Sequence, residues 1–187
     1  MVRLRSRLAR AGRVTALTGL TAAGLATGLT ATAAADPANN PADVQTLMSH
    51  LSGGYAPADC HPAGAHSAVA VAAVNCDNYS HDPGGPWNAD YLLYANTDDL
   101  NADFQRGLAE APQTPAQPFP DGTTGPTEWN RDGHYGSVVF LGTGRDDGVY
   151  LVWTDIPART LVVAEQGIAP ESTQAALYDW WQAEGVR

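Results

Sequence analysis

The sequence predicts an α+β domain in which three helices pack on a mainly antiparallel sheet of five strands. Three observations lead to this class. Apolar residues recur at helical spacing in three segments, and short runs of strand composition lie between them. Turn sequences join neighbouring strands, which makes those strands antiparallel. The predicted order is therefore helix, two strands, helix, three strands, helix, or α-β-β-α-β-β-β-α.

The first 35 residues have the composition of a secretory signal peptide. Five arginines precede an uncharged run from Val14 to Leu29, and small residues stand at the −3 and −1 positions, Ala33 and Ala35. The alternative is an uncleaved membrane anchor, but threonines and glycines interrupt the run, which falls short of the roughly 20 strongly apolar residues of a membrane span. We expect cleavage near Ala35, secretion, and a single α+β domain over residues 36–187, a length that suffices for one hydrophobic core.

The first helix of this domain is predicted between Asn40, which can cap it, and Gly53, which ends it. Pro41 fits the first helical position. The apolar residues that follow share one face at the spacing i, i+3, i+4, i+7: Val44, Leu47, Met48 and Leu51.

Two strands are predicted next, in residues 67–75 (SAVAVAAVN) and 88–96 (NADYLLYAN). The first strand alternates large and small apolar side chains, with Val69 and Val71 on one face and alanines on the other. The turn sequence DPGGP separates the two runs, so we expect them to form an antiparallel hairpin.

The clearest helix follows, with Thr97 as the expected N-cap and with Asp98 and Asp99 in the first turn, where carboxylates are favourable. Its apolar residues stand four apart: Leu100, Phe104 and Leu108. Residues 111–134 come after this helix and are rich in proline, glycine, threonine and aspartate, so we expect an exposed loop there.

Three strands are predicted after this loop, in residues 135–143, 148–156 and 159–167. The Asp-Gly pair of GRDDG favours a tight hairpin turn between the first two of them. The last helix is predicted from Pro170 to Gly185. Its apolar face consists of Leu177, Tyr178 and Trp181.

Both cysteines and three of the five histidines fall between residues 60 and 81, which suggests a metal site, a redox site or a disulfide. The spacing lacks the tight ligand pairs of zinc sites, and a redox motif needs Cys-x-x-Cys, whereas these cysteines lie sixteen positions apart. In a secreted chain with two cysteines a disulfide is the default, and it would contribute about 3 kcal/mol. We therefore expect a Cys60–Cys76 disulfide with Cα atoms within about 7 Å, and no metal.

The remaining histidines give no clear catalytic pattern. His134 lies near Asp132 and Ser137, but Ser137 lacks the strained turn that presents a nucleophile, and three residues of one short segment cannot form a Ser-His-Asp relay. The sequence predicts no catalytic residue and no cofactor. A histidine beside a buried serine or carboxylate in a cleft would favour a hydrolase instead. The histidines expected in loops or on the surface are His50, His61, His66 and His81.

Residues 36–187 are strongly acidic. They contain all 20 aspartates and glutamates but five arginines and no lysine, which gives a formal charge of −15. Such a charge repels phosphate backbones and anionic membrane surfaces, so we expect neither nucleic acid nor a membrane surface as a partner. Solubility outside the cell explains most of the charge, and binding of cations or of a basic partner is the alternative.

The tryptophans offer the candidate binding site. Trp87 and Trp129 are predicted in loops, while Trp180 and Trp181 lie about 100° apart on the last helix, so we expect one of these two to point fully inward. The rings either cover the edges of the core or border a groove for a ligand. The residues of the candidate groove are Trp87, Trp129, His134, Trp153 and Trp180.

An ordered set of motifs gives the sequence a resemblance. The set comprises AVAAVNC (70–76), DPGGP, ADYLLYANTDDLNADF (89–104), Trp129, WTD, LVVAEQG and LYDWW. Across residues 42–183 this pattern resembles the extracytoplasmic C-terminal domain of actinobacterial membrane-anchored serine/threonine protein kinases and their stand-alone exported relatives. The resemblance implies a sensor-type module whose ligand is unassigned. The kinase motifs are missing from this chain, as is the second cysteine pair that relatives carry around Trp129.

We therefore expect a secreted, monomeric, non-enzymatic module that binds a small ligand or a protein partner. A small secreted hydrolase, or a structural or inhibitor-like protein that acts through a flat surface, is the alternative. A deep apolar cleft would favour the binding module, whereas an exposed apolar patch without a cavity would favour the structural protein.

Overall fold

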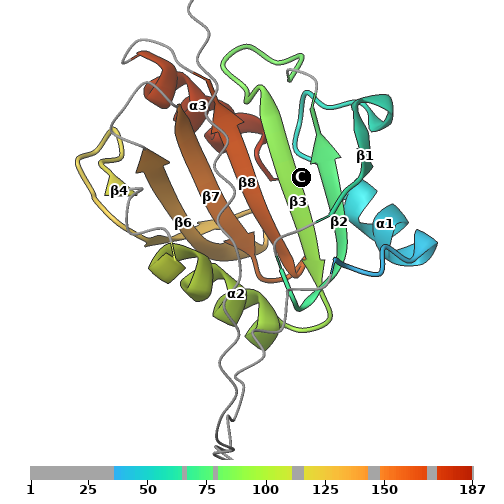
Figure 1. Cartoon of the computed structure of the whole chain (residues 1–187). Coiled ribbons are helices and arrows are strands. Elements are labelled where there is room, and N and C mark those ends of the chain that lie inside the picture. Colours follow the sequence, from blue (N-terminus) through green and yellow to red (C-terminus); the bar gives the residue numbers. More distant parts are fainter. Residues whose placement is uncertain are drawn as a thin grey trace, which may run out of the picture. The chain divides into compact units, whose positions relative to one another are not determined.

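The computed structural model shows an α+β domain in which three α-helices pack on an antiparallel sheet of eight strands (Figure 1). The predicted class and the antiparallel sheet are confirmed, but the count of five strands and the order of elements were wrong. The observed order is α-β-β-β-α-β-β-β-β-β-α. The residues that the structure describes are 36–64, 67–77, 80–110, 116–142, 148–167 and 172–186.

Several predictions of the sequence concern residues outside these ranges. They are the signal peptide, most of the GRDDG turn, His66 and the start of the last helix at Pro170. The described helices are α1 (Pro41–Met48), α2 (Thr97–Glu110) and α3 (Ser172–Glu184), with a short 3₁₀ helix, η1 (Pro57–Asp59).

The described strands are β1 (Cys60–Pro62), β2 (Ala70–Cys76), β3 (Asn88–Tyr94), β4 (Ala116–Gln117), β5 (Thr127–Arg131), β6 (His134–Gly142), β7 (Val149–Asp155) and β8 (Thr160–Gln166). They lie side by side in the order β1-β2-β3-β8-β7-β6-β4, and β5 also pairs with β6. Every one of these pairings is antiparallel, including those of β2 with β3, β6 with β7 and β7 with β8, for which the sequence predicted connecting turns.

Three strands were missing from the sequence prediction: β1, β4 and β5. β1 and β4 have three and two residues, too few to show an alternating pattern. β5 lies in the segment 111–134, which was predicted as an exposed loop. The turn after β5 is Asp132–Gly133, and both residues have positive φ (51° and 87°), as a type I′ hairpin turn requires. The Asp-Gly pair was therefore a usable signal for the β5–β6 hairpin.

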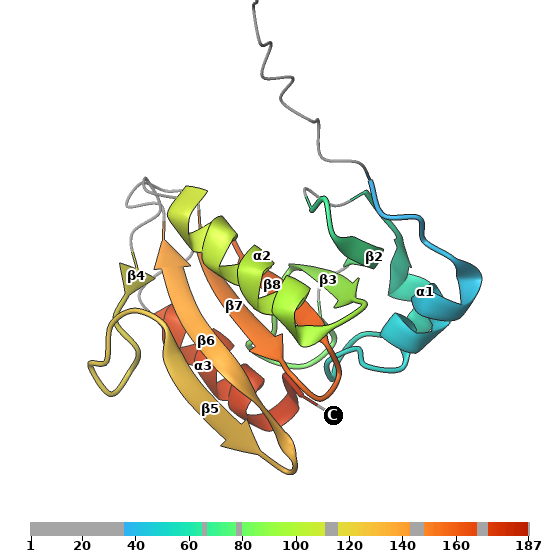
Figure 2. The same cartoon turned by 90° about the horizontal axis from the view of Figure 1, so that it is seen from below.

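The helices cover the sheet from both sides (Figure 2). α1 and α3 pack on one side, the α3 face, and α2 packs on the other side, the α2 face. Buried side chains of the α3 face include Leu47, Tyr91, Phe140, Trp153, Leu177, Trp180 and Trp181. Buried side chains of the α2 face include Leu92, Tyr94, Leu100, Phe104, Val139, Val152 and Leu161. The central strands thus bury side chains on both faces, which explains their nearly continuous apolar sequences.

The strand β2 departs from simple alternation. It begins at Ala70, and its pairing with β3 shifts register between Ala70 and Ala72. As a result Ala70 packs on the α2 face and Ala72 on the α3 face, although the alternation predicted the same side for both. Val69 precedes the strand and is exposed, so it does not share a buried face with Val71.

Two helix ends also differ from the prediction. α1 ends at Met48 instead of reaching Gly53. The cap of α2 is Asn96 rather than Thr97: the Asp99 N–H donates to Asn96 Oδ1 at 2.9 Å, and Asn96 Nδ2 donates to Asp99 Oδ2 at 2.7 Å. Asn96 satisfies a helix N–H that has no partner within the helix, which makes it the better cap.

The predicted disulfide is confirmed. Cys60 on β1 and Cys76 on β2 are direct cross-strand partners joined by a sulfur–sulfur bond, with Cα atoms 4.1 Å apart. The bond fastens the edge strand β1 to the sheet. His81 lies in a loop near this bridge, as predicted, and its Nε2 is 3.1 Å from a carboxylate oxygen of Asp59.

Aromatic rings fill the α3 face. Trp180 and Trp181 are both buried, at 3% and 2% exposure, so the expectation that only one of them points fully inward was wrong. The reason is β5, whose Trp129 ring packs edge-on against Trp181 (5.6 Å between centroids) while the Arg131 guanidinium lies over the same indole (5.3 Å). Rings of this cluster with neighbouring centroids 5.1–6.4 Å apart are Phe119, Trp129, Phe140, Trp153, Tyr178, Trp180 and Trp181.

Candidate functional site

Among the residues that the structure describes, two sets line hollows that open on the α2 face. The hairpin hollow, of about 430 Å³, is lined by Glu128, Trp129, Asn130, Tyr135, Gly136, Ser137 and Ile156. The helix cleft, of about 370 Å³, is lined by Gly64, Ala73, Asp90, Leu92, Asp103, Arg106, Gly107, Glu110, Leu161 and Val163. Both volumes suit a small ligand. A smaller hollow of about 260 Å³ lies between β5 and the end of α3.

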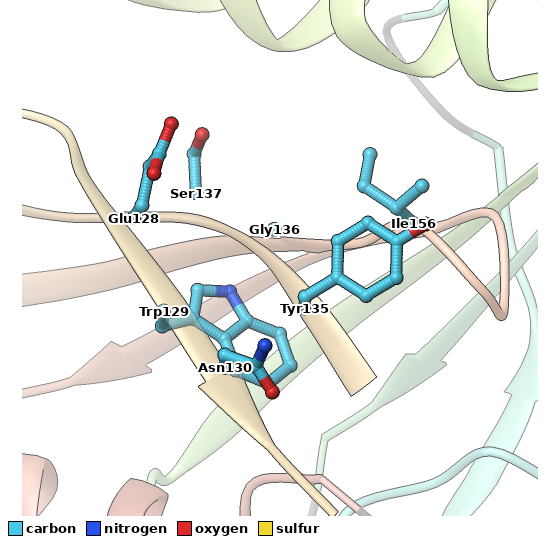
Figure 3. Close-up of a pocket in the computed structure, with 7 residues that line it drawn as sticks. All are labelled: Glu128, Trp129, Asn130, Tyr135, Gly136, Ser137 and Ile156. Carbon is cyan, nitrogen blue, oxygen red and sulfur yellow. The ribbon is translucent and has the colours of Figure 1, made fainter. Parts of the chain in front are cut away.

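The register of the β5–β6 hairpin sets the composition of the hairpin hollow. Glu128 pairs with Ser137, and Asn130 pairs with Tyr135, so these four side chains project to the same side. Figure 3 shows the Glu128 and Ser137 side chains side by side at one end of the hollow and the Tyr135 ring next to Ile156 at the other. The hollow therefore has a polar end and an apolar end.

Gly136 forms the floor of the hairpin hollow, and its neighbours require a glycine. A Cβ at this position would lie 2.0 Å from the carbonyl oxygen of Thr154. The same carbonyl accepts a hydrogen bond from Trp129 Nε1 (3.0 Å), and the Thr154 hydroxyl oxygen accepts one from the Ser137 N–H (2.9 Å). Thr154 thus joins β7 to the hairpin beyond the last regular pair of β6 and β7, and it holds the floor rigid.

The exposed groups of the hairpin hollow are chemically varied. Tyr135 is 48% exposed, more than the other exposed large hydrophobic side chains of the described residues, and Glu128 and Asn130 are exposed beside it. A carboxylate, an amide and two hydroxyls supply acceptors and donors, while the tyrosine ring and Ile156 supply an apolar surface. This combination suits a ligand that is polar at its edges and apolar on one face.

His134 has a partner that the sequence did not suggest. Its Nδ1 lies 2.6 Å from Oδ2 of the buried Asp155 on β7, rather than beside Asp132 or Ser137. Asp155 Oδ1 also accepts from the N–H of Ala158, in the turn to β8 (3.3 Å). The partner of His134 Nδ1 is thus a carboxylate rather than a hydroxyl.

The structure places the residues of the candidate tryptophan groove in different surroundings. Trp153 and Trp180 are buried in the core with ring centroids 6.4 Å apart. Trp129 lies on β5 rather than in a loop, and its ring joins the core cluster. Trp87 is half-exposed near Gly167, and His134 binds Asp155. Trp153 and Trp180 thus belong to the core of the α3 face, and Trp129 packs against this core while it also lines the hairpin hollow.

Apart from Trp129, the residues that line the hairpin hollow were not among the candidates of the sequence analysis. Glu128, Tyr135 and Ser137 lie in or beside a segment that was predicted as a loop. Polar side chains are usual in exposed loops, so they did not indicate a site there. The signal that could have found them was the alternation of TEWNR and HYGSV around Asp132–Gly133, which places every second side chain on one surface.

Within the part of the chain that the structure describes, no group of three or more histidine, cysteine or acidic side chains is placed to hold a metal ion. No helix there is long and apolar enough to cross a membrane. Comparisons with models of protein families, with curated proteins and with solved structures find no match. The resemblance to kinase sensor domains thus stays a prediction.

Proposed function

We propose that this protein is a secreted, non-enzymatic binding module that holds a saccharide in the hairpin hollow. The observation that carries the proposal is an exposed aromatic ring, Tyr135, on the same small surface as the carboxylate of Glu128. Exposure of a large aromatic ring to water is unfavourable, so an exposed ring beside convergent polar groups is typical of a recognition surface.

The two ends of the hollow match the two kinds of surface on a sugar ring. The C–H face of a pyranose is apolar and stacks on an aromatic ring, which the Tyr135 ring beside Ile156 offers. Sugar hydroxyls both donate and accept hydrogen bonds, and the Glu128 carboxylate and the Ser137 hydroxyl can satisfy them. The rigid floor at Gly136 reduces the ordering that binding would otherwise require.

Two features of the sequence support the location and role. The leader of residues 1–35 has the pattern of a secretory signal peptide. The motifs of residues 42–183 resemble extracytoplasmic sensor domains, which bind ligands without catalysing a reaction. The formal charge of −15 on residues 36–187 favours neutral or cationic ligands over anionic ones.

Isothermal titration calorimetry of the purified protein with neutral mono- and oligosaccharides tests the proposal. Replacement of Tyr135 by alanine should weaken binding of the best saccharide about tenfold, since an aromatic stacking contact contributes about 1.5 kcal/mol. Tyr135→Phe retains the ring and should bind within about threefold of the original protein. Equal affinity of the alanine variant, or no saturable binding of any saccharide, would contradict the proposal.

A hydrolase is the second candidate, and the His134–Asp155 pair favours it. A buried carboxylate that orients a histidine is one half of a general-base arrangement, which could activate a water molecule. Chromogenic esters and glycosides test this candidate: turnover that disappears in His134→Asn while the protein stays folded would support it. Turnover that is absent, or unchanged in this variant, would exclude a role of His134 in hydrolysis.

A further inference from the structure

We propose that the helix cleft is a second binding site, which takes a small organic cation whose ammonium or guanidinium group is carried on an apolar stem. The cleft lies between α2 and the strands β3 and β8, and it shares no lining residue with the hairpin hollow. The proposal therefore does not depend on the saccharide site.

The floor of the helix cleft is apolar. Leu92 of β3 and Leu161 of β8 belong to the core of the α2 face, yet both retain a small exposed area, of 8% and 7%. Val163 lies beside them and is half-buried. The floor can thus bury the methylene groups of a ligand, which is favourable at about 25 cal/mol per Å² of apolar surface.

The rim of the helix cleft is negative. Asp90 on β3 and Asp103 and Glu110 on α2 contribute three carboxylates, while Arg106 is the one basic side chain of the lining. Three carboxylates and one guanidinium give the lining a net formal charge of −2. Carboxylates close to an apolar floor interact with a cation more strongly than fully solvated carboxylates do, because the local dielectric constant is lower.

One cationic side chain, Arg106, already pairs with carboxylates of the rim. The Arg106 guanidinium forms ion pairs with the Asp103 and Glu110 carboxylates. Asp103 is buried, and the Tyr94 hydroxyl donates to its Oδ2 at 2.6 Å, so this carboxylate is held in place. The Arg106 side chain is 42% exposed and can move toward water. Arg106 thus pairs with two of the three lining carboxylates, and a ligand cation can bind at the third, Asp90.

Asp90 is the carboxylate available to a ligand. One of its oxygens, Oδ1, accepts a hydrogen bond from Asn75 Nδ2 at 2.7 Å. This neutral donor orients the carboxylate without neutralising it. Asp90 lies on the strand side of the cleft, whereas Arg106 and the carboxylates that it pairs with lie on the helix side.

Gly107 keeps the cleft open. Glycine in the interior of a helix is less stable than alanine, and no packing contact requires it, because a Cβ at this position would meet no atom within 4 Å. A side chain longer than alanine would extend over the floor of the cleft. The position thus gives a direct way to fill the site without disturbing the core.

Three probes with the same six-carbon stem test the proposal: hexylammonium, hexanol and hexanoate, each titrated into the purified protein and followed by amide chemical shifts in NMR. Hexylammonium should saturate with shifts at α2 and β3, hexanol should bind at least fivefold more weakly, and hexanoate should not bind, because of charge. Equal binding of all three, or no saturation by hexylammonium, would overturn the proposal.

Substitutions of residues that line the helix cleft test whether hexylammonium binds there. Gly107→Phe should abolish hexylammonium binding by filling the cleft, whereas Gly107→Ala, its matched control, should retain it within about twofold. Asp90→Asn should weaken binding about tenfold without a change of shape. Circular dichroism and thermal unfolding verify that each variant is folded. Unchanged affinity in both Gly107→Phe and Asp90→Asn would overturn the assignment. Tyr135→Ala should not affect hexylammonium, so failure of one site is distinguishable from failure of the other.

Discussion

The α3 face of the sheet buries a continuous cluster of aromatic rings beneath α1 and α3, whereas the α2 face carries one helix and two hollows. On the α3 face, β5 adds Trp129 and Arg131 to the side of α3, which leaves a smaller hollow at the margin. On the α2 face, Tyr135, Asp90 and Glu110 stay accessible beside the helix.

The difference separates two tasks that a small domain must combine. Close packing of large rings stabilises the fold but leaves no room for a ligand. A face with one helix buries less apolar surface and keeps rigid strands within reach of solvent. We infer that the α3 face provides most of the stability and that the α2 face provides the binding surfaces.

The largest expected effect concerns Trp153, whose ring lies 6.4 Å from the rings of both Trp180 and Trp181. Trp153→Ala should lower the free energy of unfolding by about 3–5 kcal/mol, because it leaves a large cavity in the α3 face. Denaturation with urea measures the change. Trp87→Ala is the control of the same residue type, and since Trp87 is 38% exposed it should cost about 1 kcal/mol or less. Similar losses in the two variants would contradict the inferred division of tasks.

Alkaline pH compares the two faces through one tyrosine on each. Burial raises the pKa of Tyr91, on the α3 face, and of Tyr94, on the α2 face, from 10.0 to about 12. The folded state therefore holds the phenol proton more tightly than the unfolded state does. The contribution of each phenol to the free energy of unfolding is complete below pH 10 and is lost as the pH rises toward 12. Each tyrosine should account for about 2 kcal/mol of the loss.

Urea denaturation between pH 9 and pH 12 measures these contributions. Tyr91→Phe and Tyr94→Phe should each remove their own share of the alkaline loss. At pH 7 Tyr94→Phe should also cost about 1–2 kcal/mol, because Asp103 loses its hydrogen bond from the phenol. A stability that stays constant up to pH 12 in the original protein would show that neither phenol is as buried as the structure indicates.

The smallest effect is a gain. Gly107→Ala should raise the free energy of unfolding by about 0.5–1 kcal/mol, since alanine is the better helix former and the new methyl group meets open space. Thermal unfolding measures it as a rise of a few degrees in Tm. A destabilised variant would mean that α2 closes onto the sheet more tightly than the helix cleft implies.

Sequence analysis succeeded where apolar patterns were long. The helix that contains Leu100 and Phe104 and the strands β3, β6, β7 and β8 were all predicted near their observed bounds, because periodic burial determines their composition. The strands β1 and β4 were missed because two or three residues carry no period. The same short length hid the strand pair across which the Cys60–Cys76 disulfide is formed.

The candidate sites depended on contacts between distant segments, which a single sequence does not reveal. Asp155 meets His134 across 21 positions, and Asp90 and Glu110 line one cleft only because α2 packs against β3 and β8. The error for Trp180 and Trp181 has a similar origin. A helix seen alone has one inward side, but β5 gives α3 a second covered side.

The disulfide has a consequence for molecules other than the one it stabilises. β1 pairs with β2 through three residues, and without the bond this short strand could leave the sheet. Its departure would uncover the hydrogen-bonding edge of β2, and an open edge of this kind recruits strands from neighbouring molecules. The bond between Cys60 and Cys76 keeps this edge of β2 occupied, and we expect it to lower the tendency of the protein to aggregate.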